Sequence, residues 1–436
     1  MRKIGTFTAT CVLISTVIGS GIFTTTGFMA RDLGNPTLIL FLWALGGFLA
    51  LAGALSYSEL GAALPEVGGE YVYLRRAYHP YIGFLSGWTS FTVGFGAAIA
   101  ATAASFVSYF LQVFPLGSET SLTAQLLALG LVWILTSVHL AGVGSSERLQ
   151  RILTTLKVGA IFLLVGGAVT IGEGNWNNVR VTAEPTAAST GTVFVSLIFV
   201  MYAYSGWNAA AYIAGEMKDP QRSIPRTMIW GTLFVGAVYL TLNLIYLYAL
   251  PVTALGQEPV LPVAEKAAVQ LFGPIAARLI AALLCLSLAG GVSAMVWAGP
   301  RVYYAMARDG VFPAFFADTN GADLTPKKAI VMQSVWVSLL LLSGTFEQLV
   351  IFSGFSLTIF GTLAVSAVIT LRWREPSLRR PYRVPFYPLV PLAYIILSLM
   401  IVAYTTRERP TEALLASATI LGGTPVFLLL RPRSET

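Results

Sequence analysis

The sequence has few charged residues, few cysteines and few histidines, and each shortage excludes a class of protein. Only 11% of the 436 residues are charged, whereas about 25% is usual for a soluble chain. The two cysteines, Cys11 and Cys285, lie inside apolar runs and indicate no disulfide framework. The two histidines, His79 and His139, are expected near helix ends at the membrane interface, and they match no HExxH-like spacing. We therefore expect no metal, no cofactor and no enzyme activity.

Long hydrophobic runs dominate the chain instead. Hydrophobic residues make up 56% of the sequence, and about 20 of them in succession span a bilayer as a helix. Because the connections are short, we expect a single all-α membrane domain over residues 1–436 with about twelve transmembrane helices. The runs cover residues 6–33, 37–63, 81–113, 122–141, 148–171, 190–216, 227–250, 275–305, 329–344, 347–371, 386–405 and 412–430.

The formal net charge of +7 is distributed unevenly between the two sides of the expected membrane. If residue 1 lies in the cytoplasm, 21 of the 27 lysines and arginines fall in the ends and loops on that side, and the remaining 6 fall on the other. This asymmetry follows the positive-inside rule, so we expect both termini in the cytoplasm. The lipid bilayer thus accounts for the basic charge, and no nucleic-acid partner is expected.

Gly19-Ser20-Gly21 interrupts the middle of the first run. Each glycine inside a helix costs about 1 kcal/mol relative to alanine, and freed backbone groups cost more in a bilayer. If the helix unwinds here, the N–H groups of Ser20, Gly21 and Ile22 form a site for a carboxylate. The free carbonyls near Val17 suit an ammonium group, so one break could hold an amino acid backbone. Taken alone, the same small residues are equally expected as a close-packing surface between helices.

A second interruption lies at the corresponding point of the sixth run, in Tyr202-Ala203-Tyr204-Ser205-Gly206-Trp207-Asn208. The two breaks open successive five-span halves, residues 6–171 and 190–371, and residues 386–430 supply two additional helices. Breaks at corresponding points of two halves are the best pointer in a sequence to the binding site of a transporter with inverted repeats. The pair therefore favours a substrate site over coincidental packing.

Lys157 lies in the fifth run. A lysine within a span costs about 3 kcal/mol on insertion scales and usually faces a cavity or a partner. Arg148 and Arg151 place the start of the span nearby, so Lys157 is equally expected to snorkel to the cytoplasmic surface. The sequence leaves both alternatives open.

Ionisable residues within the spans are few, mainly Glu59 and Lys157, and both are expected toward the cytoplasmic ends and not beside the breaks. A charged substrate side chain would then lose its hydration without gaining a partner. We therefore expect small to medium neutral amino acids as substrates. Residues 65–73, which follow the second run, contain proline, paired glycines and aromatics and are consistent with a partly re-entrant segment.

Several short motifs occur in the order found in a known family of membrane proteins. They resemble the amino acid-polyamine-organocation (APC) transporter family, and Gly206-Trp207-Asn208 is most similar to the L-type amino acid transporter branch and its bacterial relatives. The resemblance implies a cell-membrane protein, in a bacterial inner membrane. The motifs are Gly19-Ser20-Gly21-Ile22-Phe23, Ser58-Glu59-Leu60-Gly61, Gly68-Gly69, Trp207-Asn208 followed by Glu216 and Lys218-Asp219-Pro220, and Arg301 with Ala305-Met306-Ala307-Arg308-Asp309-Gly310.

The resemblance also implies a leucine-transporter-like fold of two inverted five-helix repeats, with broken helices 1 and 6 and two extra helices. It implies that the substrate contacts come from the two breaks. The implied contacts are Val17, Gly19, Ser20, Gly21, Ile22, Tyr202, Ser205, Gly206 and Asn208.

Each implied contact has a role in the family. Backbone N–H groups at the first break and the Ser20 hydroxyl would bind the substrate carboxylate, and carbonyls of Val17, Tyr202 and Ser205 would meet the ammonium group. Tyr202 would close over the substrate as a gate. Lys157 matches a lysine that replaces sodium in sodium-independent members.

Two departures from the family pattern limit the implied function. The segment from Phe114 to Leu122 lacks the extracellular cysteine that bonds an ancillary glycoprotein in eukaryotic L-type members, so no disulfide-linked subunit is expected. Tyr202 and Ser205 stand where phenylalanine and glycine are frequent, which implies a smaller and more polar pocket.

The function expected from these observations is secondary active transport of amino acids. The transporter would be sodium-independent and work by alternating access, as an exchanger or a proton-coupled symporter. Transport of another amine, such as a polyamine or a cationic amino acid, is the alternative. An ion channel or a membrane-embedded enzyme is a distant alternative. The sequence has no repeated filter loop and no ring of acidic residues for a channel, and no HExxH-like spacing for an enzyme.

Overall fold

The computed structural model describes residues 4–115, 121–180, 188–258, 260, 262–319, 325–342 and 346–430. The basic residues expected at the cytoplasmic chain ends, Arg2, Lys3, Arg431 and Arg433, lie outside the described residues. Residues 116–120 of the cysteine-free connection also lie outside them.

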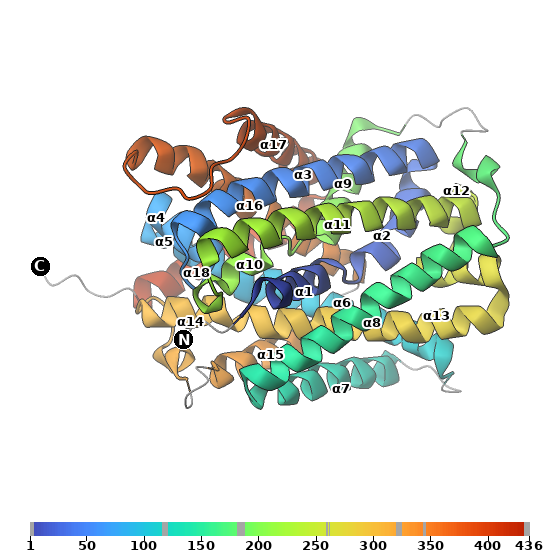
Figure 1. Ribbon diagram of the computed structural model, residues 1–436, viewed down its shortest axis with the longest axis horizontal. Coiled ribbons are helices and arrows are strands. Elements are labelled where there is room, and N and C mark those ends of the chain that lie inside the picture. Colours follow the sequence, from blue (N-terminus) through green and yellow to red (C-terminus); the bar gives the residue numbers. More distant parts are fainter. Residues whose placement is uncertain are drawn as a thin grey trace, which may run out of the picture.

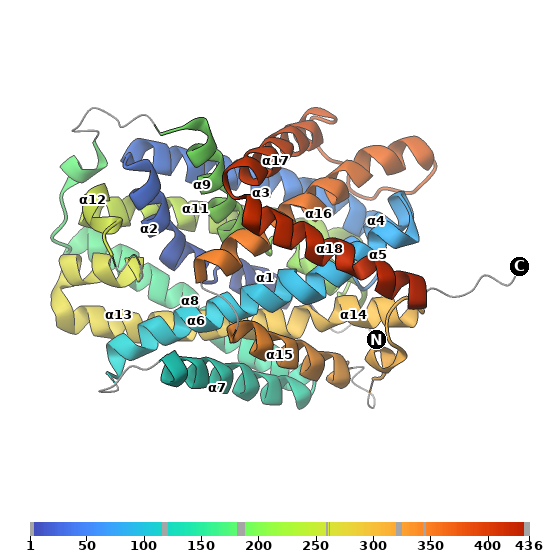
Figure 2. The same ribbon diagram turned by 180° about the vertical axis from the view of Figure 1, so that it is seen from behind.

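The described residues form helices and no strand. Ten helical segments among them are long and apolar enough to cross a membrane, as expected for an all-α membrane protein. Figures 1 and 2 show the long helices lying roughly along the longest axis of the molecule. The segments are Thr6–Leu33, Pro36–Ala63 (α3), Pro80–Val113, Leu122–Leu140 within α7 (Ser121–Leu140), Val143–Thr170 (α8), Pro220–Ala249 (α11), Val263–Arg308, Phe346–Arg374 (α16), Leu389–Glu408 (α17) and Pro410–Leu430 (α18).

Three of these segments consist of more than one helix. They are Thr6–Leu33, with α1 (Thr6–Val17) and α2 (Gly21–Leu33), Pro80–Val113, with α5 (Pro80–Thr89), the π-helix η1 (Ser90–Phe95) and α6 (Gly96–Val113), and Val263–Arg308, with α13 (Val263–Ala298) and α14 (Pro300–Arg308).

Two of the twelve predicted spans form shorter helices. The sixth run contains α9 (Thr190–Tyr204), followed by the single turn α10 (Ala209–Tyr212) and the 3-10 turn η3 (Ala214–Glu216). The ninth run contains α15 (Lys327–Leu341). Both α9 and α15 have 15 residues, fewer than the roughly 20 that cross a bilayer without irregular backbone. The structure therefore supports ten spans, and twelve stays a prediction.

The eighth span begins earlier than its hydrophobic run. α13 starts at Val263 and bends at Gly273, which has a φ of 77°. Pro274 follows directly and lacks the N–H group that a continuous helix would use. This bend separates a first short piece of α13 from the long apolar piece, which explains why the hydrophobic run marks only the second.

The segment after α3 has the irregular backbone that its glycines predict. Gly68 and Gly69 have φ values of 121° and 55°, and α4 (Glu70–Ala77) begins immediately after them. α4 packs against α5 and α16. As a result Glu70, the first residue of α4, is buried inside the bundle.

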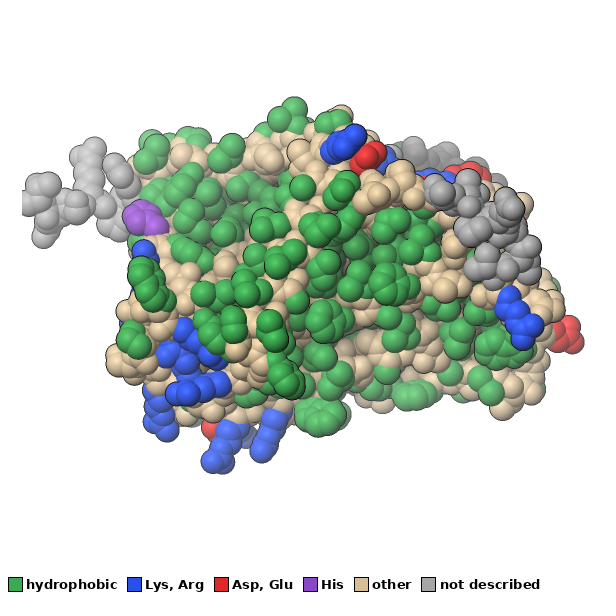
Figure 3. All heavy atoms as spheres, turned by 90° about the horizontal axis from the view of Figure 1, so that it is seen from above, with side chains coloured by type: hydrophobic (Ala, Val, Ile, Leu, Met, Phe, Trp, Pro, Cys, Tyr) green, Lys and Arg blue, Asp and Glu red, His purple; other side chains and the backbone are tan. Residues whose placement is uncertain are grey.

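The surface has a broad hydrophobic zone between two polar ends. Figure 3 shows most of the visible Lys and Arg side chains at one end, where α4 and α14 lie in Figure 1. Large hydrophobic side chains on the spans, such as Phe41, Trp230 and Ile275, are exposed. Exposed apolar side chains along the spans suit contact with lipid.

The broken helix lies in the middle of the bundle. Figure 1 shows α1 and α2 between α11 and α13. α1 packs against α8, α11 and α13, and α2 packs against α9. The break between α1 and α2 is therefore enclosed by protein, which is where irregular backbone is tolerated at membrane depth.

Candidate functional site

The structure confirms the first predicted break. α1 ends at Val17 and α2 begins at Gly21. Ile18 has φ −75° and ψ 78°, outside the helical region, and the N–H group of Gly19 donates to the carbonyl of Val17 at 2.8 Å. The first N–H groups of α2 therefore point into the break, because the first turn of a helix has no intrahelical acceptors for them.

The predicted carboxylate ligands Ser20, Gly21 and Ile22 are buried at the start of α2. The Ser20 hydroxyl oxygen lies 3.0 Å from the Tyr202 hydroxyl and 3.4 Å from the Thr102 hydroxyl. Tyr202 belongs to α9, so the predicted ligands of the two breaks meet here. Thr102, on α6, is a further contact of Ser20, and the sequence did not single it out, since it lies among other small residues.

α2 and α9 touch at Gly21. A Cβ atom on Gly21 would lie 2.5 Å from both the Cα and the Cβ atoms of Ala203. This distance is far shorter than a van der Waals contact, so only glycine permits the approach. Gly21 thus brings the two broken helices together.

The structure also confirms the second predicted break. α9 ends at Tyr204 and α10 begins at Ala209. Gly206 has a φ of 98°, a conformation that L side chains rarely adopt. A Cβ atom on Gly206 would also lie 2.6 Å from Cγ2 of Thr16 on α1. The two breaks therefore lie against each other.

Tyr239, on α11, joins the ends of α1 and α9. Its hydroxyl oxygen lies 2.6 Å from the carbonyl oxygen of Val17 and 2.9 Å from that of Ala203. The hydroxyl has one proton, so it donates to one of these carbonyls at a time. No sequence pattern pointed to Tyr239, because an aromatic residue within an apolar run is usually part of the core.

The three carbonyls expected to meet an ammonium group differ in availability. The Val17 carbonyl faces two donors, Gly19 N–H and Tyr239 Oη. The Tyr202 carbonyl accepts one bond, from Ser205 N–H at 3.0 Å. Since a carbonyl oxygen has two lone pairs, Tyr202 retains an accepting position and Val17 retains none in this conformation.

Lys157 is completely buried and does not snorkel to the surface. Its ammonium group donates to the carbonyl of Ser15 at 3.0 Å and also to the carbonyl of Ile18. These carbonyls belong to the end of α1, where a positive charge complements the helix dipole. Gly290 of α13 lies against the lysine stem, since a Cβ there would be 3.6 Å from Lys157 Cε. Lys157, on α8, thus lies between α1 and α13.

Asn208 points toward α4. Its side-chain nitrogen lies 2.7 Å from Oε1 of Glu70 and 2.9 Å from the Tyr212 hydroxyl. Oε1 of Glu70 also accepts a hydrogen bond from the Tyr57 hydroxyl at 2.7 Å. The one feature of the sequence that could have drawn attention to Glu70 is its position directly after the paired glycines Gly68 and Gly69.

The expectation that no ionisable group lies beside the breaks is therefore wrong. Lys157 contacts the first break, and Glu70, which lies outside the spans, reaches the second. Glu59 has a structural role, because Arg372 donates to it at 2.8 Å, and Arg380 lies within 3.4 Å.

His139 lies in the last turn of α7, near a helix end as expected. It is completely buried, and its ring nitrogens lie 2.8 Å from Ser146 Oγ and 3.0 Å from Ser293 Oγ. His79 is exposed. Within the described parts of the chain, no three His, Cys, Asp or Glu side chains are grouped so as to hold a metal ion.

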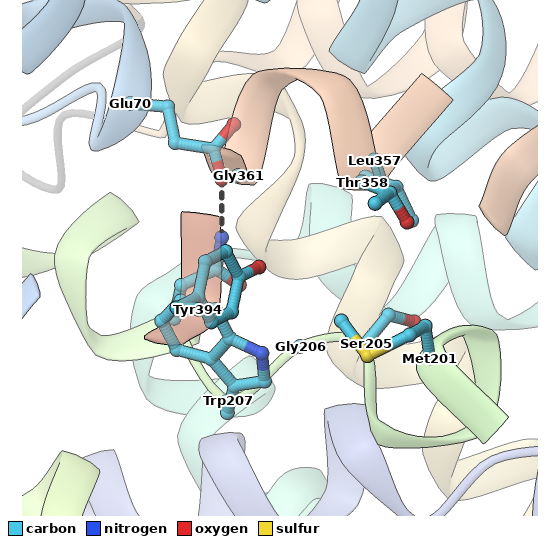
Figure 4. A pocket seen from close by; sticks show the side chains of 10 residues that line it. Glu70, Met201, Ser205, Gly206, Trp207, Leu357, Thr358, Gly361 and Tyr394 are labelled. Atoms are coloured by element: carbon cyan, nitrogen blue, oxygen red, sulfur yellow. Dashed lines mark hydrogen bonds between the residues drawn. The ribbon is translucent and has the colours of Figure 1, made fainter. Parts of the chain in front are cut away.

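A small cavity of about 30 Å³ lies beside the second break. It has room for about one or two water molecules, so an amino acid can enter only if the surrounding helices move. Figure 4 shows Glu70 and Tyr394 on one side of it and Met201 and Ser205 on another. The lining residues are Glu70, Met201, Ser205, Gly206, Trp207, Asn208, Leu357, Thr358, Gly361 and Tyr394.

Two discontinuous helices that meet at the centre of an all-helical membrane bundle are typical of secondary transporters. A family model described as amino acid permease matches residues 4–424, and the chain belongs to this family. The match confirms the resemblance to the APC superfamily. The protein is a multi-pass membrane protein that transports amino acids and is not an enzyme.

Characterised relatives match the chain over nearly its full length. The serine/threonine exchanger SteT of Bacillus subtilis is 31% identical, with 100% of this chain and 98% of the relative covered. The Asc-type amino acid transporter 1 of Mus musculus is 28% identical, with 98% and 81% covered. The large neutral amino acids transporter small subunit 2 of Homo sapiens is 29% identical, with 98% and 80% covered.

Proposed function

We propose that the protein is a sodium-independent transporter of small to medium neutral L-amino acids. It works by alternating access, as an exchanger or a proton-coupled symporter. The observation that carries this proposal is the 3.0 Å contact between the Ser20 hydroxyl at the first break and the Tyr202 hydroxyl from the helix that ends at the second. This contact brings the N–H-rich start of α2 next to an aromatic residue that can act as a gate.

The substrate backbone binds between the two breaks. The N–H groups of Ser20, Gly21 and Ile22, with the Gly19 backbone and the Ser20 hydroxyl, hold the carboxylate. The ammonium group meets the carbonyls of Tyr202 and Ser205. It reaches the Val17 carbonyl only when Tyr239 donates to Ala203 instead. Tyr202 moves aside for substrate entry, because in this conformation its hydroxyl is hydrogen-bonded to the Ser20 hydroxyl that would bind the carboxylate.

The side-chain pocket is an enlarged form of the cavity beside Gly206. Its lining contains hydroxyl and amide groups, from Ser205, Asn208 and Thr358. It also contains the apolar side chains of Met201 and Leu357. This mixed lining suits small side chains that are neutral, with or without a hydroxyl. A relative named as a serine/threonine exchanger supports the same size class.

Lys157 takes the place of a sodium ion. Its ammonium group neutralises the carbonyl end of α1, which is the position where a bound cation would otherwise stabilise the break. A fixed positive charge there removes the need for sodium in the transport cycle.

The proposed topology follows the distribution of charge. The end of the molecule that is rich in lysine and arginine faces the cytoplasm, with both termini, in the bacterial inner membrane (Figure 3). The domain then has twelve spans, in inverted repeats over residues 6–171 and 190–371 and two additional helices over 386–430. The matching positions of the breaks support the repeat.

The protein needs no disulfide-linked ancillary subunit. The sequence has two cysteines, and both Cys11 and Cys285 are buried and free. Neither is therefore available for a covalent bond to a partner chain.

One observation favours a second candidate, a transporter of cationic amino acids or polyamines. Glu70 is a carboxyl group in the lining of the cavity, and an amine on the substrate side chain would pair with it. Competition for uptake separates the candidates. If arginine, lysine or putrescine competes better than alanine, serine, threonine and leucine, the second candidate is correct.

Counterflow in proteoliposomes tests the proposed function. Vesicles loaded with unlabelled serine should accumulate labelled serine transiently and saturably in sodium-free buffer, and a thermal-shift screen of the twenty amino acids should rank small neutral ones first. A channel or an enzyme would show no saturable counterflow.

A further inference from the structure

Two carboxyl groups are buried in the described parts of the chain, those of Glu59 and Glu70, and they differ in whether a positive charge lies beside them. Glu59 is paired with two guanidinium groups, those of Arg372 and Arg380. Glu70 is 5% exposed, and no Lys, Arg or His among the described residues lies within ion-pairing distance of it. Its Oε1 atom accepts hydrogen bonds only from neutral groups, Tyr57 Oη and Asn208 Nδ2, both at 2.7 Å. Glu70 is therefore a buried carboxyl group without a counter-charge.

The titratable groups that face Glu70 from the surrounding helices are phenols, which are uncharged near neutral pH. They are Tyr57 on α3, Tyr73 on α4, Tyr212 on α10 and Tyr394 on α17.

The basic residues nearest in sequence and on the packed helices bind elsewhere. Arg75 pairs with Asp309 and Arg76 with Glu375, and His79 before α5 is exposed. On α16, Arg372 pairs with Glu59 and Arg374 donates to the carbonyl of Ala77. No fixed positive charge therefore neutralises Glu70, and only a proton can do so in this conformation.

Three effects set the protonation of Glu70. Burial favours the neutral acid, whereas hydrogen bonding by the neighbouring polar side chains, first of all Tyr57 and Asn208, and the N-terminal end of α4 favour the carboxylate. Burial is the largest of them, and it raises the pKa of the Glu70 carboxyl above its ordinary value. Opening of the cavity to water would reverse this effect, so the affinity for a proton changes with the conformation.

Asn208 connects the charge on Glu70 to the second break. Its amide nitrogen is shared between Glu70 and Tyr212, and it directly precedes α10. A hydrogen bond to a carboxylate is stronger than one to a neutral acid. Protonation of Glu70 thus weakens the bond that holds Asn208 and the start of α10 to α4.

We propose that Glu70 is the proton-binding site that couples amino acid transport to proton movement. The carboxylate takes up one proton from the side to which the cavity opens, keeps it while the cavity is closed, and releases it on the opposite side. This inference rests on the proposed transport function and makes the protein a proton-coupled symporter. Lys157 then acts as a fixed charge and carries no proton.

The test compares two assays in proteoliposomes of parent protein and Glu70→Gln, which resembles the protonated form. Because Glu70 also lines the substrate cavity, the accumulation by each protein is normalised to its own serine counterflow at symmetrical pH, which needs no net proton movement. Only the parent should accumulate serine against its gradient when the outside is acidic. The counterflow of Glu70→Gln should also not vary between pH 5 and 8.

The outcomes separate this inference from the proposed function. Absence of serine counterflow by the parent protein would refute the transport proposal itself. If the parent shows counterflow but no accumulation driven by the pH gradient, or if Glu70→Gln accumulates serine as the parent does, Glu70 is not the coupling site.

A second variant keeps the proposal testable if Glu70→Gln does not insert. Tyr57 Oη donates to the carboxylate and stabilises its charged form, so Tyr57→Phe should raise the proton affinity of Glu70. The pH of half-maximal transport should then move upward by roughly half a unit. Tyr73→Phe is the matched control, because the Tyr73 hydroxyl has no hydrogen-bond partner among the described residues. Equal midpoints in Tyr57→Phe and Tyr73→Phe would overturn the assignment.

Discussion

Ser20 and Tyr202 are 182 positions apart in the chain, and their hydroxyl groups lie 3.0 Å from each other. Ser20 starts the second half of the first broken helix, and Tyr202 lies in the last turn of α9. In this closed arrangement the two hydroxyl groups form a hydrogen bond with each other. In the proposed function, substrate binding replaces this contact with hydrogen bonds to the substrate carboxylate.

Removal of the Tyr202 hydroxyl should affect binding less than removal of the ring. Tyr202→Phe loses one hydrogen bond, worth about 1 kcal/mol, so the KM for serine should change by no more than about fivefold. Tyr202→Ala loses the group that closes over the substrate, and counterflow should fall at least tenfold. Counterflow kinetics measure both, and equal effects of the two variants would contradict a gating role for the ring.

Gly21→Val should abolish uptake while membrane insertion stays largely intact. A Cβ atom at this position would meet Ala203 at 2.5 Å, so the added side chain forces α2 and α9 apart. Overpacking of this kind costs about 1–3 kcal/mol, which distorts the site without preventing insertion.

The matched control for this variant is Gly159→Val, since a Cβ atom on Gly159 has no neighbour within 4 Å. It should transport normally. Normal uptake by a correctly inserted Gly21→Val protein would remove the basis for the proposed carboxylate site.

The breaks were predictable because glycine leaves a direct mark in the sequence. Irregular backbone is predicted from the glycines alone, at Gly19, Gly21 and Gly206, without knowledge of any tertiary contact. Lys157 was different, since a long side chain can reach either the surface or the interior, and only its contacts with Ser15 and Ile18 decide between them.

The residues that the sequence did not reveal are joined by packing between distant segments. Tyr239 contacts Val17 across 222 positions, and Glu70 contacts Asn208 across 138. Neither residue type is unusual in its own segment. Their roles come from the crossing of helices, which a hydrophobic pattern does not encode.

Tyr239→Phe should lower the thermal stability of the purified protein. The change removes the hydroxyl that donates to the carbonyl of Val17 or of Ala203. The Val17 carbonyl keeps the Gly19 N–H as a donor, whereas the Ala203 carbonyl loses the Tyr239 donor, and a buried acceptor left without a donor costs about 1–3 kcal/mol. Tyr246→Phe on the same helix is the control, because the Tyr246 hydroxyl has no hydrogen-bond partner in the described residues. A Tm loss of the same size in both variants would show that Tyr239 does not hold the two half-helices.

Transport should proceed without sodium and depend on Lys157. The ammonium group of Lys157 contacts the carbonyls of Ser15 and Ile18 at the end of α1, so Lys157→Ala leaves both without this donor and removes the charge that complements the helix dipole. Counterflow by Lys157→Ala should fall at least tenfold. The parent should transport equally in sodium-free and sodium-containing buffer, and a requirement for sodium would refute the substitution of a sodium ion by Lys157.

A pH series on the same variant separates a fixed charge from a proton carrier. If Lys157 is a fixed charge, the activity that remains in Lys157→Ala should keep the pH dependence of the parent, because the titrating group is Glu70. A pH dependence that disappears in Lys157→Ala and persists in Glu70→Gln would assign the proton to Lys157 instead. The two single variants, measured side by side, therefore decide which of the two buried groups carries the proton through the closed state.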